Sequence, residues 1–194
     1  MEKFIRHIIL VIAVAFAITA CSVSNNSINQ KEEKMSLEDL EKRIQSIEDI
    51  EAIKQLKATY AEYCDDSYNP EKMMGIFTED AVWDGGERFG KYTGHKEIKE
   101  FFQNASKSLV FGAHFFLQPR ITLTGKNTAK ANWYLWQTST MANGKGVWIC
   151  GLEDDEYRKG KDGKWRMSNM KLTLFYVTSY EDGWHKAPWS GLED

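Results

Sequence analysis

The chain changes its hydrophobic period once, and this change restricts the fold more than any other feature of the sequence. Between residues 36 and 108 most apolar residues recur at steps of three and four, which is typical of helices that bury one face. Beyond that point four stretches alternate with a period of two, at 110–123, 129–141, 147–157 and 165–176. Short polar turns separate them (TGKN, ANGKG and KGKDGK). Helices followed by an antiparallel meander predict an α+β fold, with the helices packed on one face of the sheet.

Three helices are expected before the meander. Ser36 followed by Asp39 approximates a capping box and begins the first helix, whose apolar stripe runs through Ile53 to Tyr60. Pro70 opens a short second helix, PEKMMGIF, because proline suits the first helical turn. A short strand, DAVWDGG, is then followed by a third helix, GHKEIKEFFQNAS.

The first helix carries a second apolar stripe near its start, made of Leu37, Leu40, Ile44 and Ile47. This stripe is shifted from the later one, so the early part of the helix has another surface to bury. A partner subunit or the outside of the domain's own sheet would serve, and the spacing does not choose between them.

The stretch 129–141 indicates what surrounds the sheet. One of its faces is mainly Ala, Trp and Leu, while the other carries Asn132, Tyr134, Trp136 and Thr138. An antiparallel sheet with one face in water should alternate apolar with charged residues. Because neither face is cleanly polar, we expect helices over one face and another subunit over the other. The chain is therefore expected to form a homo-oligomer, either a trimer or a dimer.

The N-terminus has the pattern of an export signal. Lys3 and Arg6 precede an apolar run that ends in ITAC at Cys21. This ending resembles the bacterial lipobox, in which the cysteine is lipidated; an ordinary cleaved signal is the alternative.

We therefore expect a lipoprotein signal peptide at 1–20, a flexible tether at 21–35 and one folded domain at 36–194. The protein should be exported and held at a membrane through Cys21. Ser22 favours the outer membrane in a Gram-negative host, and the cell surface is expected otherwise.

Composition argues against two classes of function. The formal net charge is −3 and no basic stripe is found, so nucleic acid is not an expected partner. Four scattered histidines and the lack of CxxC or HExxH spacing give no metal-ligand pattern. Cys64 and Cys150 could form a disulfide, but we favour small buried apolar residues at these positions.

Several motifs occur in an order that is similar to one family. They are IEAIKQLKATYAEYCDD, FTEDAVWDGG, YTGHKEIKEFF, HFFLQPRITL, NTAKANWYLW and DDEYRKGKDGKWRMS. This order resembles the SnoaL-like branch of the nuclear-transport-factor-2-like superfamily. The resemblance implies a curved antiparallel sheet wrapped by N-terminal helices into a cone with a central pocket. It also implies kinship with lyases, among them dehydratases and dehydrochlorinases, which need no cofactor.

In those lyases an aspartate after the first helix and a histidine on the first long strand form a dyad. The matching residues here are Asp65 and His114, and Tyr60 matches a tyrosine common at its position. Asp66 is a rival to Asp65, because this sequence has one extra residue before Phe77. A carboxylate on one ring nitrogen of a histidine fixes its tautomer, so that the other nitrogen can accept a proton from a carbon acid.

The match to the family is incomplete. Where the dehydratases place a tyrosine that assists the leaving oxygen, this chain has Trp83 and Asp84. Asp84, Tyr134 and Glu153 are possible substitutes for that acid. The residues expected to line the pocket and bind substrate are Asp66, Trp83, Asp84, Phe116, Trp133, Tyr134, Gln137 and Trp148.

Three functions are weighed. The first is a cofactor-free lyase or isomerase that acts on a hydrophobic ring compound through an Asp65–His114 general base. The second is a non-catalytic lipoprotein module that holds an apolar ligand or a partner in the same pocket. The third is an oxygenase or cyclase of the polyketide type.

Overall fold

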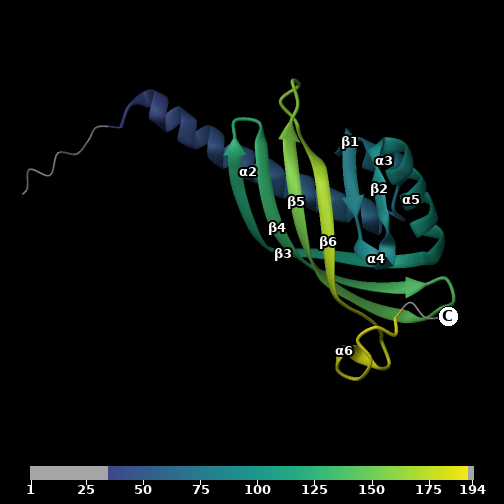
Figure 1. Ribbon diagram of the computed structural model, residues 1–194. Coiled ribbons are helices and arrows are strands. Elements are labelled where there is room, and N and C mark those ends of the chain that lie inside the picture. Colours follow the sequence, from purple (N-terminus) through teal and green to yellow (C-terminus); the bar gives the residue numbers. More distant parts are fainter. Residues whose placement is uncertain (1–34, 192–194) are drawn as a thin grey trace, which may run out of the picture. The chain divides into compact units, whose positions relative to one another are not determined.

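The computed structural model describes residues 35–191, and the expected signal peptide and most of the tether lie outside this part of the chain (Figure 1). The chain divides into two compact units between Glu41 and Lys42, which falls inside the first helix, α2 (Leu37–Asp65). In the first unit the backbone N–H of Asp39 donates to Ser36 Oγ over 3.1 Å, and Ser36 Oγ donates to Asp39 Oδ2 over 2.6 Å. The N-cap hydroxyl thus accepts from the backbone N–H three residues on, which is one half of the predicted capping box.

The second unit holds the remainder of α2 and all other elements. They follow in the order α3 (Pro70–Met74), β1 (Phe77–Asp84), α4 (Gly86–Phe89), β2 (Lys91–Thr93), α5 (Gly94–Ser108), β3 (Leu109–Gly125), β4 (Thr128–Met141), β5 (Gly146–Lys159), β6 (Trp165–Ser179) and α6 (Gly183–Lys186). The predicted helices and strands are confirmed within a few residues of their ends. The short elements α4, β2 and α6 were not predicted, since each has only three or four residues.

One curved, unclosed six-stranded sheet organises this unit, with the strand order β2-β1-β6-β5-β4-β3 (Figure 1). The long strands β3 to β6 form the predicted antiparallel meander. The strand β1 joins it by pairing parallel to β6, and β2 pairs with β1 at the edge. The α+β fold predicted from the sequence is confirmed.

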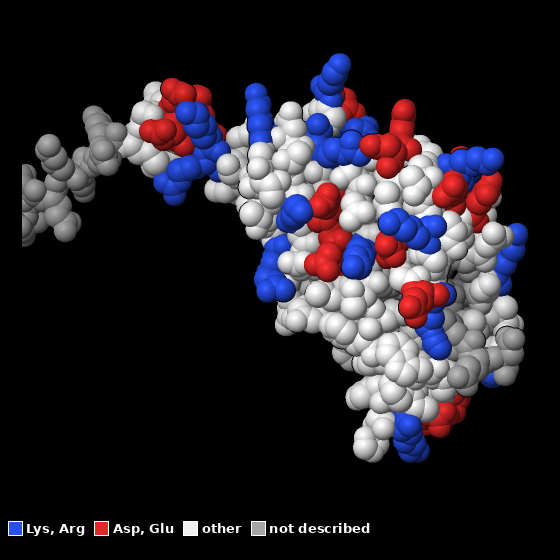
Figure 2. Space-filling view, in the orientation of Figure 1, with Lys and Arg blue, Asp and Glu red and all other residues white. Residues whose placement is uncertain are grey.

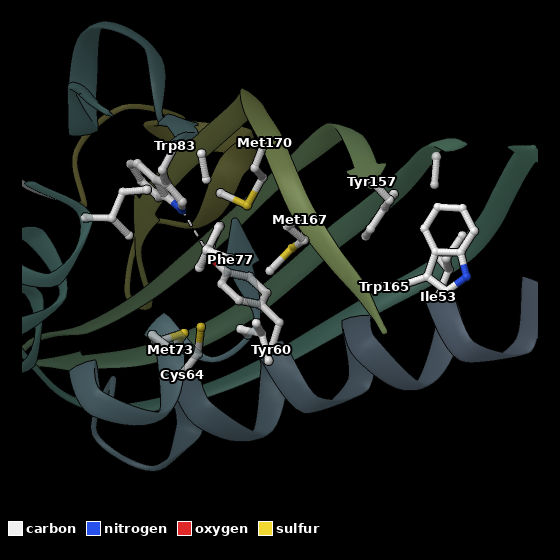
Figure 3. Packing of buried hydrophobic residues seen from close by; sticks show 14 of the residues in the cluster. Ile53, Tyr60, Cys64, Met73, Phe77, Trp83, Tyr157, Trp165, Met167 and Met170 are labelled. Atoms are coloured by element: carbon white, nitrogen blue, oxygen red, sulfur yellow. Dashed lines mark hydrogen bonds between the residues drawn. The ribbon is translucent and has the colours of Figure 1, made fainter. Parts of the chain in front are cut away.

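The main core lies between α2 and the inner face of the sheet (Figure 3). On α2 the buried side chains recur at steps of three and four and include Ile53, Tyr60 and Cys64. Lys57 belongs to the same buried row and is 1% exposed, so a charged residue lies in the middle of an otherwise apolar stripe. A lysine is almost never fully buried without partners, and its partners belong to the candidate site described below.

The two faces of β4 differ sharply in burial. The side chains of Ala129, Trp133 and Leu135 are buried, whereas Tyr134 is 39% and Trp136 45% exposed. Helices of this chain thus cover the inner face of the sheet, as expected, whereas the outer face of β4 is not covered by the described part of the chain. In the view of Figure 2, charged side chains gather over the upper part of the second unit, whereas the surface below them has few charged side chains.

Two other expectations can be located in the second unit. Ile44 and Ile47 on α2 are 47% and 67% exposed, so the second apolar stripe has no cover there. Cys64 and Cys150 are both free thiols, with Cys64 buried. Among the described residues, no helix is long and apolar enough to cross a membrane.

Candidate active site

A cavity of about 320 Å³ lies between the inner face of the sheet and the helices. Its wall is mostly aromatic and aliphatic, with a few polar groups, as is usual for small-molecule sites. The lining residues are Tyr60, Cys64, Tyr68, Trp83, Arg88, Phe89, Tyr92, Phe101, Phe102, Asn104, Ala105, Ser108, Leu109, His114, Phe116, Leu135, Gln137, Met141, Ile149, Glu153 and Leu172.

His114 on β3 is paired with Asp65 at the end of α2. The distance from His114 Nδ1 to Asp65 Oδ1 is 2.7 Å, and the backbone N–H of His114 donates to the same oxygen over 3.0 Å. Because a carboxylate can only accept, Nδ1 carries the proton in the neutral imidazole and Nε2 keeps its lone pair. The side chain of His114 is 5% exposed and that of Asp65 is 40% exposed. The carboxylate thus reaches the ring from outside the cavity wall.

The rival carboxylate points elsewhere. Asp66 Oδ2 accepts a hydrogen bond from Lys72 Nζ over 2.8 Å at the exposed end of α2, and this contact lowers the pKa of Asp66. Asp65 is therefore the aspartate that meets His114. Asp66, which was also expected to bind substrate, does not line the cavity, because its carboxylate is turned to Lys72 at the surface.

Tyr68 approaches the other nitrogen of the same ring. Its hydroxyl lies 3.2 Å from His114 Nε2, and the two rings meet edge to face with their centroids 5.5 Å apart. Gln137 Nε2 donates to the Tyr68 oxygen over 3.2 Å, so the phenol proton is free to point to Nε2. Burial raises the pKa of Tyr68 well above its ordinary value, which keeps the phenol neutral and able to donate.

The backbone that presents Tyr68 is unusual. Ser67 and Tyr68 both have positive φ angles, 55° and 52°, a conformation that is uncommon for residues other than glycine. It ends α2 sharply, and the N–H groups of Tyr68 and Asn69 donate back to the carbonyls of Cys64 and Tyr63 over 3.1 Å each. The turn directs the side chain of Tyr68 into the protein, although the residues around it are mostly polar. Such strain concentrates at functional sites.

Gly112 makes room for the imidazole. A Cβ on this residue would lie 3.0 Å from His114 Cε1 and 3.4 Å from Nδ1, which is closer than ordinary contact. Gly112 and His114 are two residues apart on β3 and so point to the same side of the sheet. The glycine therefore allows the ring to lie along the strand toward Asp65.

Tyr60 and Trp83 form another part of the wall. Trp83 Nε1 donates to the Tyr60 hydroxyl over 3.2 Å (Figure 3), and both residues are buried. Tyr60 also packs against Phe116 with ring centroids 5.6 Å apart. These three residues were expected at the site, and all three line the cavity, as does Gln137.

The buried Lys57 lies beside the cavity in a cluster of carboxylates. Its Nζ donates to Glu153 Oε2 and, over 2.8 Å, to Asp155 Oδ2. Burial opposes the charge of Lys57, but the two carboxylates outweigh it and raise the pKa of the ammonium group. Tyr157 donates to Asp155 Oδ2 over 2.6 Å. Of these four residues, only Glu153 lines the cavity.

Besides Asp66, four residues expected in the pocket lie outside its lining. Tyr134 and Trp148 point to the outer face of the sheet, because the strand alternation turns them away from the helices. Trp133 points inward but is buried in the core, where its Nε1 donates to Tyr157 over 3.1 Å. Asp84 accepts from the backbone N–H of Gly86 over 3.0 Å and begins a turn.

The sequence analysis missed Tyr68 as a site residue. The only local signal was a tyrosine next to the helix end that carries Asp65. In the described part of the chain, no group of three or more His, Cys, Asp or Glu side chains is placed to hold a metal ion.

Comparison with known proteins identifies the type of domain. The model of the SnoaL-like domain family matches residues 45–171 of this chain. The comparison with curated proteins finds none that matches.

Solved structures with the same fold include a protein from Novosphingobium aromaticivorans assigned as an aromatic ring hydroxylase. It is 28% identical with a TM-score of 0.65, and the match covers 70% of this chain and 96% of that one. A protein from the same organism assigned as a scytalone dehydratase is 18% identical, with a TM-score of 0.66 and coverage of 71% and 91%. Hexachlorocyclohexane dehydrochlorinase (LinA, type 2) is 17% identical, with a TM-score of 0.65 and coverage of 71% and 92%.

Proposed function

The chain belongs to the SnoaL-like domain family, and we propose that it is a cofactor-free lyase or isomerase that removes a proton from a hydrophobic ring-type small molecule. The names of two similar structures, a scytalone dehydratase and a dehydrochlorinase, support an elimination. The observation that carries the proposal is the Asp65–His114 pair, which presents Nε2 of the imidazole at the wall of an apolar cavity.

In this mechanism His114 is the general base. Asp65 holds the Nδ1 proton, orients the ring and stabilises the imidazolium that forms when Nε2 accepts a proton from carbon. The substrate C–H takes the place that the Tyr68 hydroxyl has at Nε2. Tyr68 keeps its bond from Gln137 and can then donate to a substrate oxygen. Tyr60 and Trp83 shape the wall against which the ring packs.

The apolar lining favours a ring compound. Phe101, Phe102, Phe116 and Tyr92 contribute aromatic surface to the cavity, which suits a flat hydrophobic molecule. The volume, about 320 Å³, is within the range of small-molecule sites.

The experiment that tests the proposal replaces His114 by Gln, which keeps polarity and approximate size. Wild-type protein and H114Q are assayed against a panel of β-hydroxy and β-chloro ring ketones by the absorbance of the conjugated product. We expect turnover by the wild type and its loss in H114Q, with an unchanged far-UV circular dichroism spectrum. Equal turnover by H114Q would remove His114 from the mechanism.

A non-catalytic binding module is the second candidate. It is favoured by one observation, the hydrogen bond between Tyr68 and His114 Nε2, which occupies the base in the absence of ligand. This function predicts that the wild type binds an apolar ring compound without converting it, and that H114Q binds it as tightly. Quenching of the fluorescence of Trp83 on the cavity wall would report such binding.

We also propose where the protein acts and how it assembles. An export signal and lipidation at Cys21 would hold the domain at a membrane through the 21–35 tether. The exposed Phe115, Tyr134, Trp136 and Phe175 form an apolar outer face on β3, β4 and β6 that suits contact with further copies of the chain. The location is supported by the N-terminal sequence pattern, and the assembly is supported by the exposure of these four aromatic side chains.

A further inference from the structure

We propose that Glu153 is the acid of this cavity, a carboxyl group that keeps its proton and donates it to an oxygen leaving group of a substrate whose C–H bond meets the His114 base in the same cavity. This proposal rests on the lyase function proposed above and deepens it, because it assigns the substrate class. The substrate is a ring compound that loses hydroxide as water. A halide, which leaves as a stable anion, has no need of this acid.

The position of Glu153 is the first argument. Glu153 lies on β5 opposite Trp133 of β4 and Leu172 of β6, it is 2% exposed, and it lines the same cavity as His114. The partner that the described structure gives it is Lys57, which donates to Oε2. No hydrogen bond to Oε1 is found within residues 35–191, so that oxygen is available to a molecule in the cavity.

Charge balance in the cluster is the second argument. Lys57 is one cation between two buried carboxylates, and a second buried anion would lack compensation. Asp155 Oδ2 accepts from both Lys57 and Tyr157, whereas Glu153 has Lys57 alone. Asp155 thus receives two hydrogen-bond donors and Glu153 only one, so we assign the extra proton to Glu153. Asp155 Oδ1 is buried and has no hydrogen-bond partner in the described structure. The cluster therefore has fewer hydrogen-bond donors than its two carboxyl groups could use.

The surroundings of Glu153 hold it in this state. The titratable groups that face it are Lys57, Tyr60 and Cys64 from α2 and Asp155 and Tyr157 from its own strand. Burial raises the pKa of Glu153 to about 7 against the pull of Lys57, and the charge of Asp155 adds to the rise. Tyr60 and Cys64 remain neutral, because burial raises the pKa of both groups well above the ordinary values.

The chemical step then balances. The substrate C–H bond breaks and its proton goes to His114 Nε2, the electron pair forms the C=C bond, and the C–O bond breaks. The departing oxygen takes the proton of Glu153 and leaves as water, so Glu153 becomes a carboxylate and His114 an imidazolium. Transfer of one proton from His114 to Glu153 through water in the cavity restores both groups.

The first arm of the test needs no substrate. Protein carrying glutamate labelled with carbon-13 at the side-chain carboxyl is titrated by NMR, in the wild type and in Glu153→Gln. We expect one signal with a midpoint of about 7 that is missing only in E153Q. The matched control is Glu156→Gln, on the exposed face of the same strand, which should keep that signal. Removing the second carboxylate by Asp155→Asn should move the midpoint toward that of an ordinary glutamate. If E153Q removes only a signal with an ordinary midpoint, the proposal is wrong.

The second arm measures turnover with a β-hydroxy ring ketone and its β-chloro analogue. E153Q should lose on the order of 10²–10⁴-fold in kcat on the hydroxyl compound and keep the chloride within a few fold. E156Q should keep both rates, and H114Q should lose both. Equal loss on both compounds in E153Q would reject the acid role while the base remains, and full activity in H114Q would reject the lyase function itself. If the wild type converts neither compound, the lyase function fails for this class and the NMR arm alone decides whether Glu153 keeps its proton.

Discussion

The hydroxyl of Tyr68 lies 3.2 Å from Nε2 of His114, the nitrogen that would have to accept a proton in the proposed reaction. The tyrosine therefore shields the base in the absence of ligand and must give way when a substrate enters. Its place is fixed by the hydrogen bond from Gln137 and by stacking on Phe102, with ring centroids 6.1 Å apart. A substrate that binds at His114 would therefore replace the hydrogen bond between Tyr68 and Nε2 with its own contact to that nitrogen.

Replacing Tyr68 by Phe should test this exchange. The stacking on Phe102 is kept and only the hydroxyl is lost, so we expect the fold to be unchanged. If Tyr68 donates to the substrate, kcat should fall about 5-fold, since one hydrogen bond is worth about 1 kcal/mol. Nitrogen-15 NMR of the His114 ring should show the loss of the bond to Nε2. An unchanged ring spectrum would contradict the contact.

Asp65 and Asp66 offer a matched pair of substitutions. Asp65→Asn removes the charge that orients the His114 ring, and we expect a fall in kcat on the order of 10²–10⁴-fold. Asp66→Asn changes a neighbouring residue whose carboxylate pairs with Lys72 at the surface, and activity should be retained. Steady-state kinetics of the two variants side by side give the comparison. Similar losses in both would argue that the helix end, and not the dyad, is what matters.

Replacing Lys57 by Met should strongly destabilise the protein. The change leaves Glu153 and Asp155 buried without their cation, and the loss of one partner of a buried ion pair costs about 3–5 kcal/mol. Urea unfolding followed by tryptophan fluorescence measures the change. Lys54→Met, one helical turn earlier at an exposed pair with Glu51, is the control and should leave the midpoint unchanged. A stable K57M protein would mean that both carboxyl groups can hold protons.

The stability of the protein should depend on pH through Glu153. Its pKa is about 7 when folded, compared with the ordinary value of 4.5 that we expect in the unfolded chain. Between these values the unfolded chain releases the proton and the folded protein keeps it, so the free energy of unfolding falls as the pH rises through this window. The fall should end above the folded pKa. E153Q should lack this fall, and parallel pH curves for the two proteins would contradict the shift.

The outer face of the sheet should control assembly. Trp136 is 45% exposed on β4 and stands next to Trp148, with ring centroids 6.0 Å apart. If copies of the chain meet here, Trp136→Lys should convert the oligomer to monomers in analytical ultracentrifugation at micromolar concentration. Lys130→Ala, an exposed residue on the same strand, should leave the assembly intact. A wild-type protein that sediments as a monomer would rule out the proposed oligomer.

Much of the architecture was determined by the sequence itself. The change from a helical period to alternation predicts helices followed by a meander, because those two periods are set by backbone geometry. The motif order led to Asp65 and His114, which the fold brings together from positions 49 residues apart. Tyr60, Trp83, Phe116 and Gln137, which the sequence analysis expected at the site, lie on the cavity wall, and their roles there stay predictions.

Other features were decided only by the tertiary structure. Alternation predicts that Trp133 and Tyr134 face opposite ways, but it does not say whether an inward side chain meets the cavity or the core. Tyr68 enters the site through a left-handed turn that the local sequence does not encode. Lys57 and Asp155 look like ordinary surface residues in the sequence, and Glu153 was one of three residues that could replace the leaving-group acid. They form a buried cluster only because α2 crosses β5 at that point, since residues almost a hundred positions apart are joined by packing and not by any local pattern.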